Sequence, residues 1–277
     1  MSLPKTRACV KFRSFSGTAR GSFFCPRRYD NCIKCSMLNG IFSTQSGKSA
    51  NEKELDIIAN NLANALTAGY KAVAPAFDST VIEEAAGPDQ LPATYVNISD
   101  SYTQFFDAPF AETGNTFDLA IDGAGFFAVS TPGGTMYTRN GQFGLNVEKK
   151  LVTQSGNPVM SQNGGDVTID GKNVTIGKDG SIYVDKLLVD KLKVVDFQNK
   201  QDLKNTGGSL FVNTNEKNSE VPAEGFSVKQ GAYETSNVDI MREMVRMITV
   251  LRAYESYTKV DQSTSDMLSK LIDLGKF

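Results

Sequence analysis

The sequence of 277 residues contains no histidine and no tryptophan, and all four of its cysteines lie near its start. Without histidine the chain lacks imidazole general bases, Ser–His and Cys–His nucleophile pairs, and the commonest metal ligand. No run approaches the roughly 20 apolar residues of a membrane-spanning helix. These absences argue against an enzyme, and we expect no catalytic residue, no metal site and no cofactor.

The chain also has a low net charge, −2 in total. A molecule with so little net charge has no large basic field for nucleic acid, so we expect no nucleic-acid partner. Because no long apolar run is present, we also expect no membrane insertion. The length and the 40% hydrophobic content are enough to bury a real core. From the length of the chain alone we expect about two domains.

Residues 1–36 differ from the remainder. They hold eight of the 29 lysines and arginines but one acidic residue, Asp30. A zinc or redox site at Cys32–Cys35 is one interpretation, but Cys9 and Cys25 do not form the second CxxC pair of a zinc site. The alternative, which we favour, is that residues 1–36 are a non-native or disordered leader and that Met37 is the working start.

Two other motifs resemble ligand sites. Ser46–Ser49 contains the GKS of a phosphate-binding loop, but Phe42 stands where that loop needs its first glycine. Asp118 and Asp122 could serve a hydrolase, but positions i and i+4 of one strand lie roughly 13 Å apart, too far for a carboxylate pair. We interpret both carboxylates as solvent-facing positions of a strand.

The sequence periodicity divides the rest of the chain. A helix is predicted from Met37 to about Leu66, with Gly69 as a left-handed cap, so that residues 37–70 form an N-terminal helical segment. Residues 71–112, with several proline and glycine breakers, are predicted to be an extended linker. From residue 113 to 230 short alternating runs with Gly- and Asn-rich connections predict an antiparallel β domain, including a hairpin turn at Asn140–Gly141.

Residues 231–277 return to helical periodicity. Ser236 and Asp239 resemble a capping box, and apolar residues at three- and four-residue steps continue to about Leu274. One exposed apolar stripe of this length would be an aggregation hazard. We therefore predict an α+β fold whose long N- and C-terminal helices pack together, and on copies from neighbouring chains, as a coiled-coil-like domain.

Several sequence blocks resemble the rod and hook proteins of the bacterial flagellum. They occur in the family's order from Met37 nearly to the last residue. In this sequence they are Leu55–Asn64 (LDIIANNLAN), Gly69–Lys71 (GYK), Thr113–Asn115, Leu119–Phe127 (LAIDGAGFF), Tyr137–Phe143 (YTRNGQF), Gln230–Val238 (QGAYETSNV), Glu243–Val245 and Arg252–Glu255. Within the family, Leu38–Phe42 and the length after Met37 favour the proximal-rod branch, followed by the distal-rod branch. Ala65–Leu66 and Tyr70 depart mildly from the family pattern.

The resemblance implies an inner tube of paired terminal helices and an outer β domain, stacked head to tail around a hollow axis. It implies a structural subunit of the periplasm-spanning rod in the flagellar basal body, exported unfolded and polymerised through its terminal helices. The implied partners are copies of the chain, other rod proteins and the flagellar export apparatus. The alternatives are a distal-rod or hook subunit and, from a different class, a secreted β-rich adhesin or binding module.

The amides in the first helix fit this arrangement, because asparagine can hydrogen-bond a neighbouring helix at low volume. We expect Asn60 and Asn64, four residues apart on one face, to face other subunits. The residues that we expect to carry assembly are Leu55, Ile58, Asn60, Asn61, Leu62, Asn64, Gly69, Met241, Val245, Ile248, Leu251, Tyr254, Leu268 and Leu271.

Overall fold

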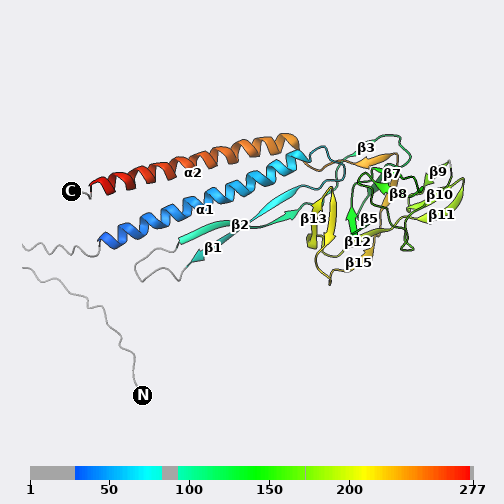
Figure 1. Ribbon diagram of the computed structural model, residues 1–277, viewed down its shortest axis with the longest axis horizontal. Coiled ribbons are helices and arrows are strands. Elements are labelled where there is room, and N and C mark those ends of the chain that lie inside the picture. Colours follow the sequence, from blue (N-terminus) through cyan, green and yellow to red (C-terminus); the bar gives the residue numbers. More distant parts are fainter. Residues whose placement is uncertain (1–28, 83–92, 172, 275–277) are drawn as a thin grey trace, which may run out of the picture.

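Figure 1 shows the computed structural model, which describes residues 29–82, 93–171 and 173–274. Two long helices lie side by side at one end of an elongated molecule, and the β-rich region forms the other end. Most of the expected leader, including Cys9 and Cys25, lies outside the described residues. Its last residues belong to the first helix, which is described from Tyr29 and so includes residues before the predicted start at Met37. No glycine or proline lies between Pro26 and Gly40 to stop a helix there.

The two helices are α1 (Tyr29–Ala63) and α2 (Ile240–Leu274), each of 35 residues and therefore about 52 Å long. They run antiparallel and pack on each other, which confirms the predicted α+β fold with paired terminal helices. Asp239 caps α2, since its carboxylate accepts hydrogen bonds from the backbone N–H groups of Met241 and Arg242. The cap is thus Asp239, three residues beyond the Ser236 that the capping-box pattern indicated.

Polar side chains fix the alignment of the helix pair. Arg246 Nε donates to Glu54 Oε1 at 2.9 Å, and Tyr254 Oη donates to Glu52 Oε1 at 3.1 Å. Farther along, Gly47 lies against the ring of Tyr257, where an added Cβ would come within 2.8 Å of Cζ. The glycine of the GKS motif therefore serves close helix packing.

The expected linker is extended, but it forms an element of its own. Strands β1 (Val73–Ile82) and β2 (Ala93–Thr103) pair as an antiparallel ribbon that lies along α1. Ile98 is buried, and Lys53 Nζ of α1 donates to its carbonyl oxygen at 3.1 Å. A two-stranded ribbon is marginal alone, so its packing on the helix stabilises it.

The remaining strands form the β-rich region, which is antiparallel as predicted. Their bounds are β3 (Phe110–Glu112), β4 (Leu119–Asp122), β5 (Phe126–Thr131), β6 (Gly134–Thr138), β7 (Phe143–Leu145), β8 (Leu151–Thr153), β9 (Val174–Ile176), β10 (Ser181–Val184), β11 (Leu187–Lys191), β12 (Val194–Phe197), β13 (Leu203–Gly207), β14 (Leu210–Asn213), β15 (Glu220–Pro222), β16 (Ser227–Gln230) and β17 (Ala232–Glu234), with a 3₁₀ turn at Lys200–Asp202.

Six of these strands form the largest sheet, in the order β13-β14-β6-β5-β12-β15. Alternating apolar residues of β5 supply both faces: Phe127 and Val129 belong to one buried cluster, and Phe126 and Ala128 belong to the other. Strand β3 pairs with β17, so the β-rich region extends slightly beyond residues 113–230 on both sides.

Two local predictions in this region are wrong. Asn140–Gly141 does not close a hairpin, because β6 pairs with β5 and β14 while β7 pairs with β8. Gly141 instead allows the chain to cross Leu119, whose carbonyl oxygen would lie 1.6 Å from an added Cβ. Asp118 is buried, not solvent-facing: it accepts hydrogen bonds from the side chains of Thr113 and Asn115. Its carboxylate stabilises the loop before β4.

Candidate functional site

The helix pair joins the β-rich region through a buried cluster of three charged side chains. Lys71 Nζ lies 2.6 Å from Glu234 Oε1, and Arg139 Nη1 lies 3.3 Å from Glu234 Oε2. The side chains of Lys71 and Glu234 are each only 1% exposed. The same Lys71 ammonium donates to the carbonyl oxygen of Phe106, and Glu234 accepts from the backbone N–H of Ala108. We call this set the ion cluster.

The electrostatics of the ion cluster follow from its burial. Burial lowers the pKa of Lys71 by disfavouring the ammonium, while the Glu234 carboxylate acts in the opposite direction. Arg139 is further held by the carbonyl oxygens of Ile121 and Gly123. Buried charges persist in proteins when they are paired and hydrogen-bonded in this way. The cluster therefore locks three distant segments of the chain into one arrangement.

Backbone contacts next to the ion cluster complete the junction. Asn237 accepts from the N–H of Ala72 at 2.7 Å and donates to the carbonyl oxygen of Gln104 at 2.8 Å. Gly69 donates to the carbonyl oxygen of Glu234 at 2.8 Å. Its φ of +66° confirms the predicted left-handed residue at the end of the helical segment. An added Cβ on Gly69 would come within 2.2 Å of the backbone nitrogen of Asn140.

The asparagines of α1 make contacts within the subunit. Asn61 is buried, and its side-chain amide makes two hydrogen bonds with the backbone of Val73. Asn61 Nδ2 donates to the carbonyl oxygen of Val73, and Asn61 Oδ1 accepts from the N–H of Val73. Tyr70 Oη donates to Asn60 Oδ1 at 2.8 Å, and burial together with the Glu243 carboxylate raises the pKa of Tyr70 to about 12. Asn64 Nδ2 donates to the carbonyl oxygen of Asn60. At least Asn61 serves the subunit's own fold.

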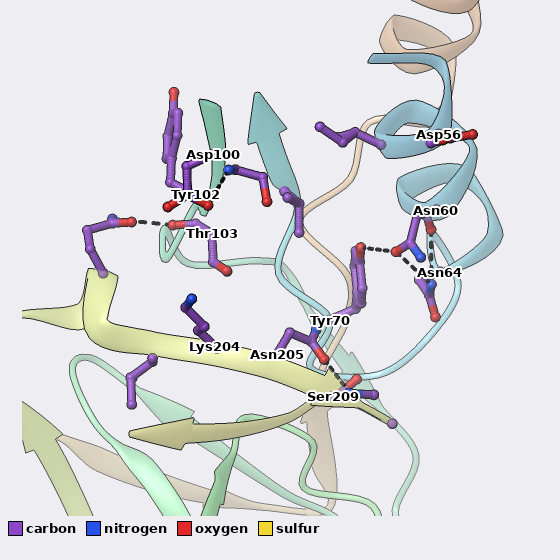
Figure 2. A pocket seen from close by; sticks show the side chains of 17 residues that line it. Asp56, Asn60, Asn64, Tyr70, Asp100, Tyr102, Thr103, Lys204, Asn205 and Ser209 are labelled. Carbon is purple, nitrogen blue, oxygen red and sulfur yellow. Dashed lines mark hydrogen bonds between the residues drawn. The ribbon is translucent and has the colours of Figure 1, made fainter. Parts of the chain in front are cut away.

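A cleft of about 580 Å³, lined mainly by polar residues, lies beside these amides. Figure 2 shows the side chains that line it. Asn60, Asn64 and Tyr70 form one wall, and residues of β2 form the wall opposite. Lys204 and Asn205 of β13 lie along its floor. The cleft thus lies between α1, the ribbon and the edge of the large sheet, and Asn60 and Asn64 line it.

The expected assembly residues of α2 behave differently from those of α1. In α1, Ile58 is fully buried, and Leu55 and Leu62 are half-buried. Tyr254 of α2 lies in the contact with α1. In α2 many large apolar side chains are exposed in the subunit. Those of the first three turns lie on the side of the helix opposite the face that meets α1, and those nearer its end are spread around the helix. We call these exposed side chains together the uncovered face; they are Met241, Met244, Val245, Ile248, Leu251, Val260, Met267, Leu268, Leu271, Ile272 and Leu274.

Sequence reasoning did not single out Lys71, Arg139, Glu234 or Asn237. Each lies in a block that carried the family resemblance, but no spacing rule connects residues so far apart in the chain. The structure does not pair Asp118 with Asp122, which is exposed and lies 2.8 Å from Lys229 Nζ. Within the described ranges, no group of histidine, cysteine and acidic side chains could hold a metal ion, and neither helix has the length and hydropathy of a membrane span.

Comparisons with known proteins identify the family. Residues 43–71 match the model of the flagella basal body rod protein, residues 120–184 the flagellar hook protein FlgE/F/G D1 domain, and residues 229–274 the flagellar basal body rod FlgEFG protein C-terminal region. The rod protein FlgF of Caulobacter vibrioides is 36% identical over 248 residues, which cover 87% of this chain and 99% of that relative. The chain belongs to the flagellar basal-body rod protein family.

Other members of the rod family match over similar lengths. FlgF of Mesorhizobium japonicum is 31% identical, covering 85% of this chain and 97% of the relative. FlgG of Bacillus subtilis is 32% identical, covering 87% and 100%. The chain is therefore a structural subunit of the basal-body rod, and the predictions of a rod function, a basal-body location and no enzymatic activity are confirmed.

The three matched regions meet at the ion cluster. Lys71 ends the first matched region, Arg139 lies in the second and Glu234 in the third. Each family segment thus contributes one charge to the junction that holds a rod subunit together.

Proposed function

We propose that this rod subunit is exported unfolded and joins the growing rod head to tail through its terminal helices. Its partners are copies of itself, other rod proteins and the flagellar export apparatus. The supporting observation is the uncovered face of α2, which leaves large apolar side chains in solvent along most of a 35-residue helix. Burying such a face is favourable, and extended apolar patches on soluble proteins mark interaction sites.

The proposed contact between subunits can be placed from the packing of α2 on α1 within one subunit. One face meets α1, with Met247, Val250, Tyr254 and Tyr257 at alternating three- and four-residue steps. This spacing supports the finer proposal of a coiled-coil-like inner domain. The uncovered face then meets the helices of neighbouring subunits. Because a heterologous contact that does not close into a ring extends as a helix, it builds a shaft.

The same proposal assigns a role to each part of the chain. Residues 37–70 and 231–277 form the inner domain, residues 71–112 connect it, and residues 113–230 form the outer domain. The assembly residues then fall into two groups. Met241, Val245, Ile248, Leu251, Leu268 and Leu271 contact other subunits directly. The group that holds the helix pair in place is Leu55, Ile58, Asn61, Leu62, Gly69 and Tyr254. Asn60 and Asn64 contact a neighbouring subunit that enters the cleft which they line.

Replacing Ile248 with Glu tests this role of the uncovered face. Ile248 is 52% exposed in the subunit, so the free energy of unfolding should change by no more than about 0.5 kcal/mol. Assembly would bury an unpaired carboxylate, so we expect the variant to be lost from purified basal bodies. Lys259→Glu, an exposed charge reversal on the same helix, is the matched control. Equal incorporation of both variants would exclude the uncovered face as the assembly surface.

Limited proteolysis tests folding coupled to assembly. A long helix with few buried contacts is marginal until partners cover it. We expect trypsin to cleave the isolated subunit first at exposed sites of the helix pair, such as Arg252 and Lys259, and at Lys53 of α1. Sites inside the β-rich region, such as Arg139, should resist. Equal resistance of both parts, measured as fragment masses over time, would contradict the proposal.

A further inference from the structure

Helix α1 has an exposed side that differs in chemistry from the exposed side of α2. Glu52, Asp56, Ala59 and Ala63 are all exposed. They follow one another at steps of four, three and four residues, so they lie on one side of the helix. This side therefore presents two carboxylates and two methyl groups to solvent. We call these four residues the small face.

The first three turns of α2 have the opposite character. Met241, Val245 and Ile248 are 71%, 62% and 52% exposed, on the side of α2 that points away from α1. The distance between packed helices depends on the side chains at their contact. Large apolar side chains on one helix and alanines on the other therefore allow close packing without voids. The small face of α1 is a suitable surface for the uncovered face of α2.

The orientation of subunits in a shaft determines which parts of these faces can meet. In a head-to-tail shaft all subunits point along one axis. Helix α2 of one subunit and α1 of a subunit beside it then run antiparallel, as the two helices do within one subunit (Figure 1). Within the subunit, Gly47 lies against Tyr257 and Gly69 is hydrogen-bonded to Glu234. Interpolation between these two contacts gives the residues of α1 and α2 that lie at equal height.

Equal heights bring complementary residues together. Val245 comes to the height of Ala59, and Arg252 comes to the height of Glu52. Arg252 and Glu52 are exposed on the sides of α2 and α1 that meet in this arrangement. Asp56 lies one turn from Glu52, so Arg252 meets a carboxylate even when the neighbour is offset by one turn. Complementary charges of this kind fix the register of an interface.

We propose that the small face of α1 receives the first three turns of the uncovered face of α2 from a neighbouring copy of the chain. This inference rests on the proposed assembly through α2, and it adds which surface of the next subunit is the partner. The two faces differ, so the contact is heterologous. Each subunit offers its apolar face to one neighbour and its small face to another, and the contact repeats along the shaft.

Disulfide cross-linking in the assembled rod tests this contact. The four native cysteines are replaced with serine, and Val245→Cys is combined with Ala59→Cys, or with Ala63→Cys for an offset of one turn. Two cysteines form a disulfide only when their Cα atoms lie within about 7 Å. We expect oxidation of purified basal bodies to give a reducible band at twice the subunit mass for at least one of these pairs.

Matched variants control the cross-linking. Lys259→Cys combined with Ala59→Cys should give no such band, because Lys259 is exposed on the same side of α2 but about 21 Å farther along the helix. Val245→Cys alone should also remain at the subunit mass, which excludes a contact between two α2 helices. An incorporated chain that forms no dimer with either test pair would overturn the proposal.

Charge reversal with rescue tests the register. Arg252→Glu should lower the amount of the chain recovered with basal bodies about tenfold, because it places like charges opposite each other. Glu52→Lys in the same chain should restore most of it. A loss that Glu52→Lys does not relieve, at an unchanged melting temperature of the isolated subunit, would contradict the pairing. If Ile248→Glu is still lost from basal bodies in that case, assembly through α2 stands and only its partner surface is wrong.

Discussion

Replacing Glu234 with Gln is expected to lower the free energy of unfolding by about 3–5 kcal/mol, measured by urea denaturation of the isolated subunit. The side chain keeps its size, but the only carboxylate of the ion cluster is lost. The ammonium of Lys71 and the guanidinium of Arg139 then remain buried without the carboxylate that pairs with both of them. Removing one partner of a buried pair is costly because the remaining charge is uncompensated.

The control for Glu234 separates burial from the loss of a charge. Glu216 is exposed, so Glu216→Gln should change the free energy of unfolding by no more than about 0.5 kcal/mol. Lys71→Met combined with Glu234→Gln should cost less than the sum of the two single changes, because the pair is removed together. A loss below about 1 kcal/mol for Glu234→Gln, or strict additivity in the double variant, would show that the ion cluster does not hold the junction.

The parts of the fold that the sequence predicted are those governed by local periodicity. The apolar steps of α2 repeat over some ten turns, so its course as far as Leu274, the last described residue, could be predicted from the pattern. Gly69 could be assigned because only glycine adopts positive φ at low cost. Strand β10 (Ser181–Val184) is one of the short alternating runs from which the β domain was predicted, and clear turn residues flank it.

The junction could not be predicted because it depends on contacts between distant segments. Lys71 and Glu234 are 163 positions apart, and nothing in either local pattern marks a buried ion pair. Asn140–Gly141 has the residues of a tight hairpin, yet the strands that it connects pair elsewhere. Tertiary pairing overrides a local turn preference when the flanking strands find better partners.

The asparagines of α1 show how a correct observation received an incomplete explanation. Asparagine is a poor helix former, so three of them in two turns require compensating contacts. Asn61 obtains them from the first residue of β1, and Asn60 from Tyr70. Sequence alone could not distinguish a partner on the same chain from a partner on a neighbouring subunit.

Replacing Gly69 with Ala is expected to undock the helix pair from the β-rich region, with a loss of more than about 3 kcal/mol in the free energy of unfolding. Two costs add. The φ of +66° disfavours any residue with a Cβ, and the new Cβ would lie 2.2–2.6 Å from the backbone of Arg139 and Asn140, which flexible side chains cannot relieve. Urea denaturation measures the loss, and trypsin cleavage after Lys71, which is buried in the native subunit, reports the undocking.

Gly114 separates these two costs, because it has a similar φ of +72° but nothing within 4 Å of an added Cβ. Gly114→Ala should therefore lose only about 1–2 kcal/mol, the cost of the left-handed conformation alone, and should leave Lys71 protected from trypsin. The difference between the two variants measures what close backbone contact contributes at the junction. If Gly69→Ala lost no more than Gly114→Ala and Lys71 stayed protected, the helix pair would not depend on the tight crossing of residue 69 over Asn140. The rod subunit would then hold its two parts together by the ion cluster without help from this contact.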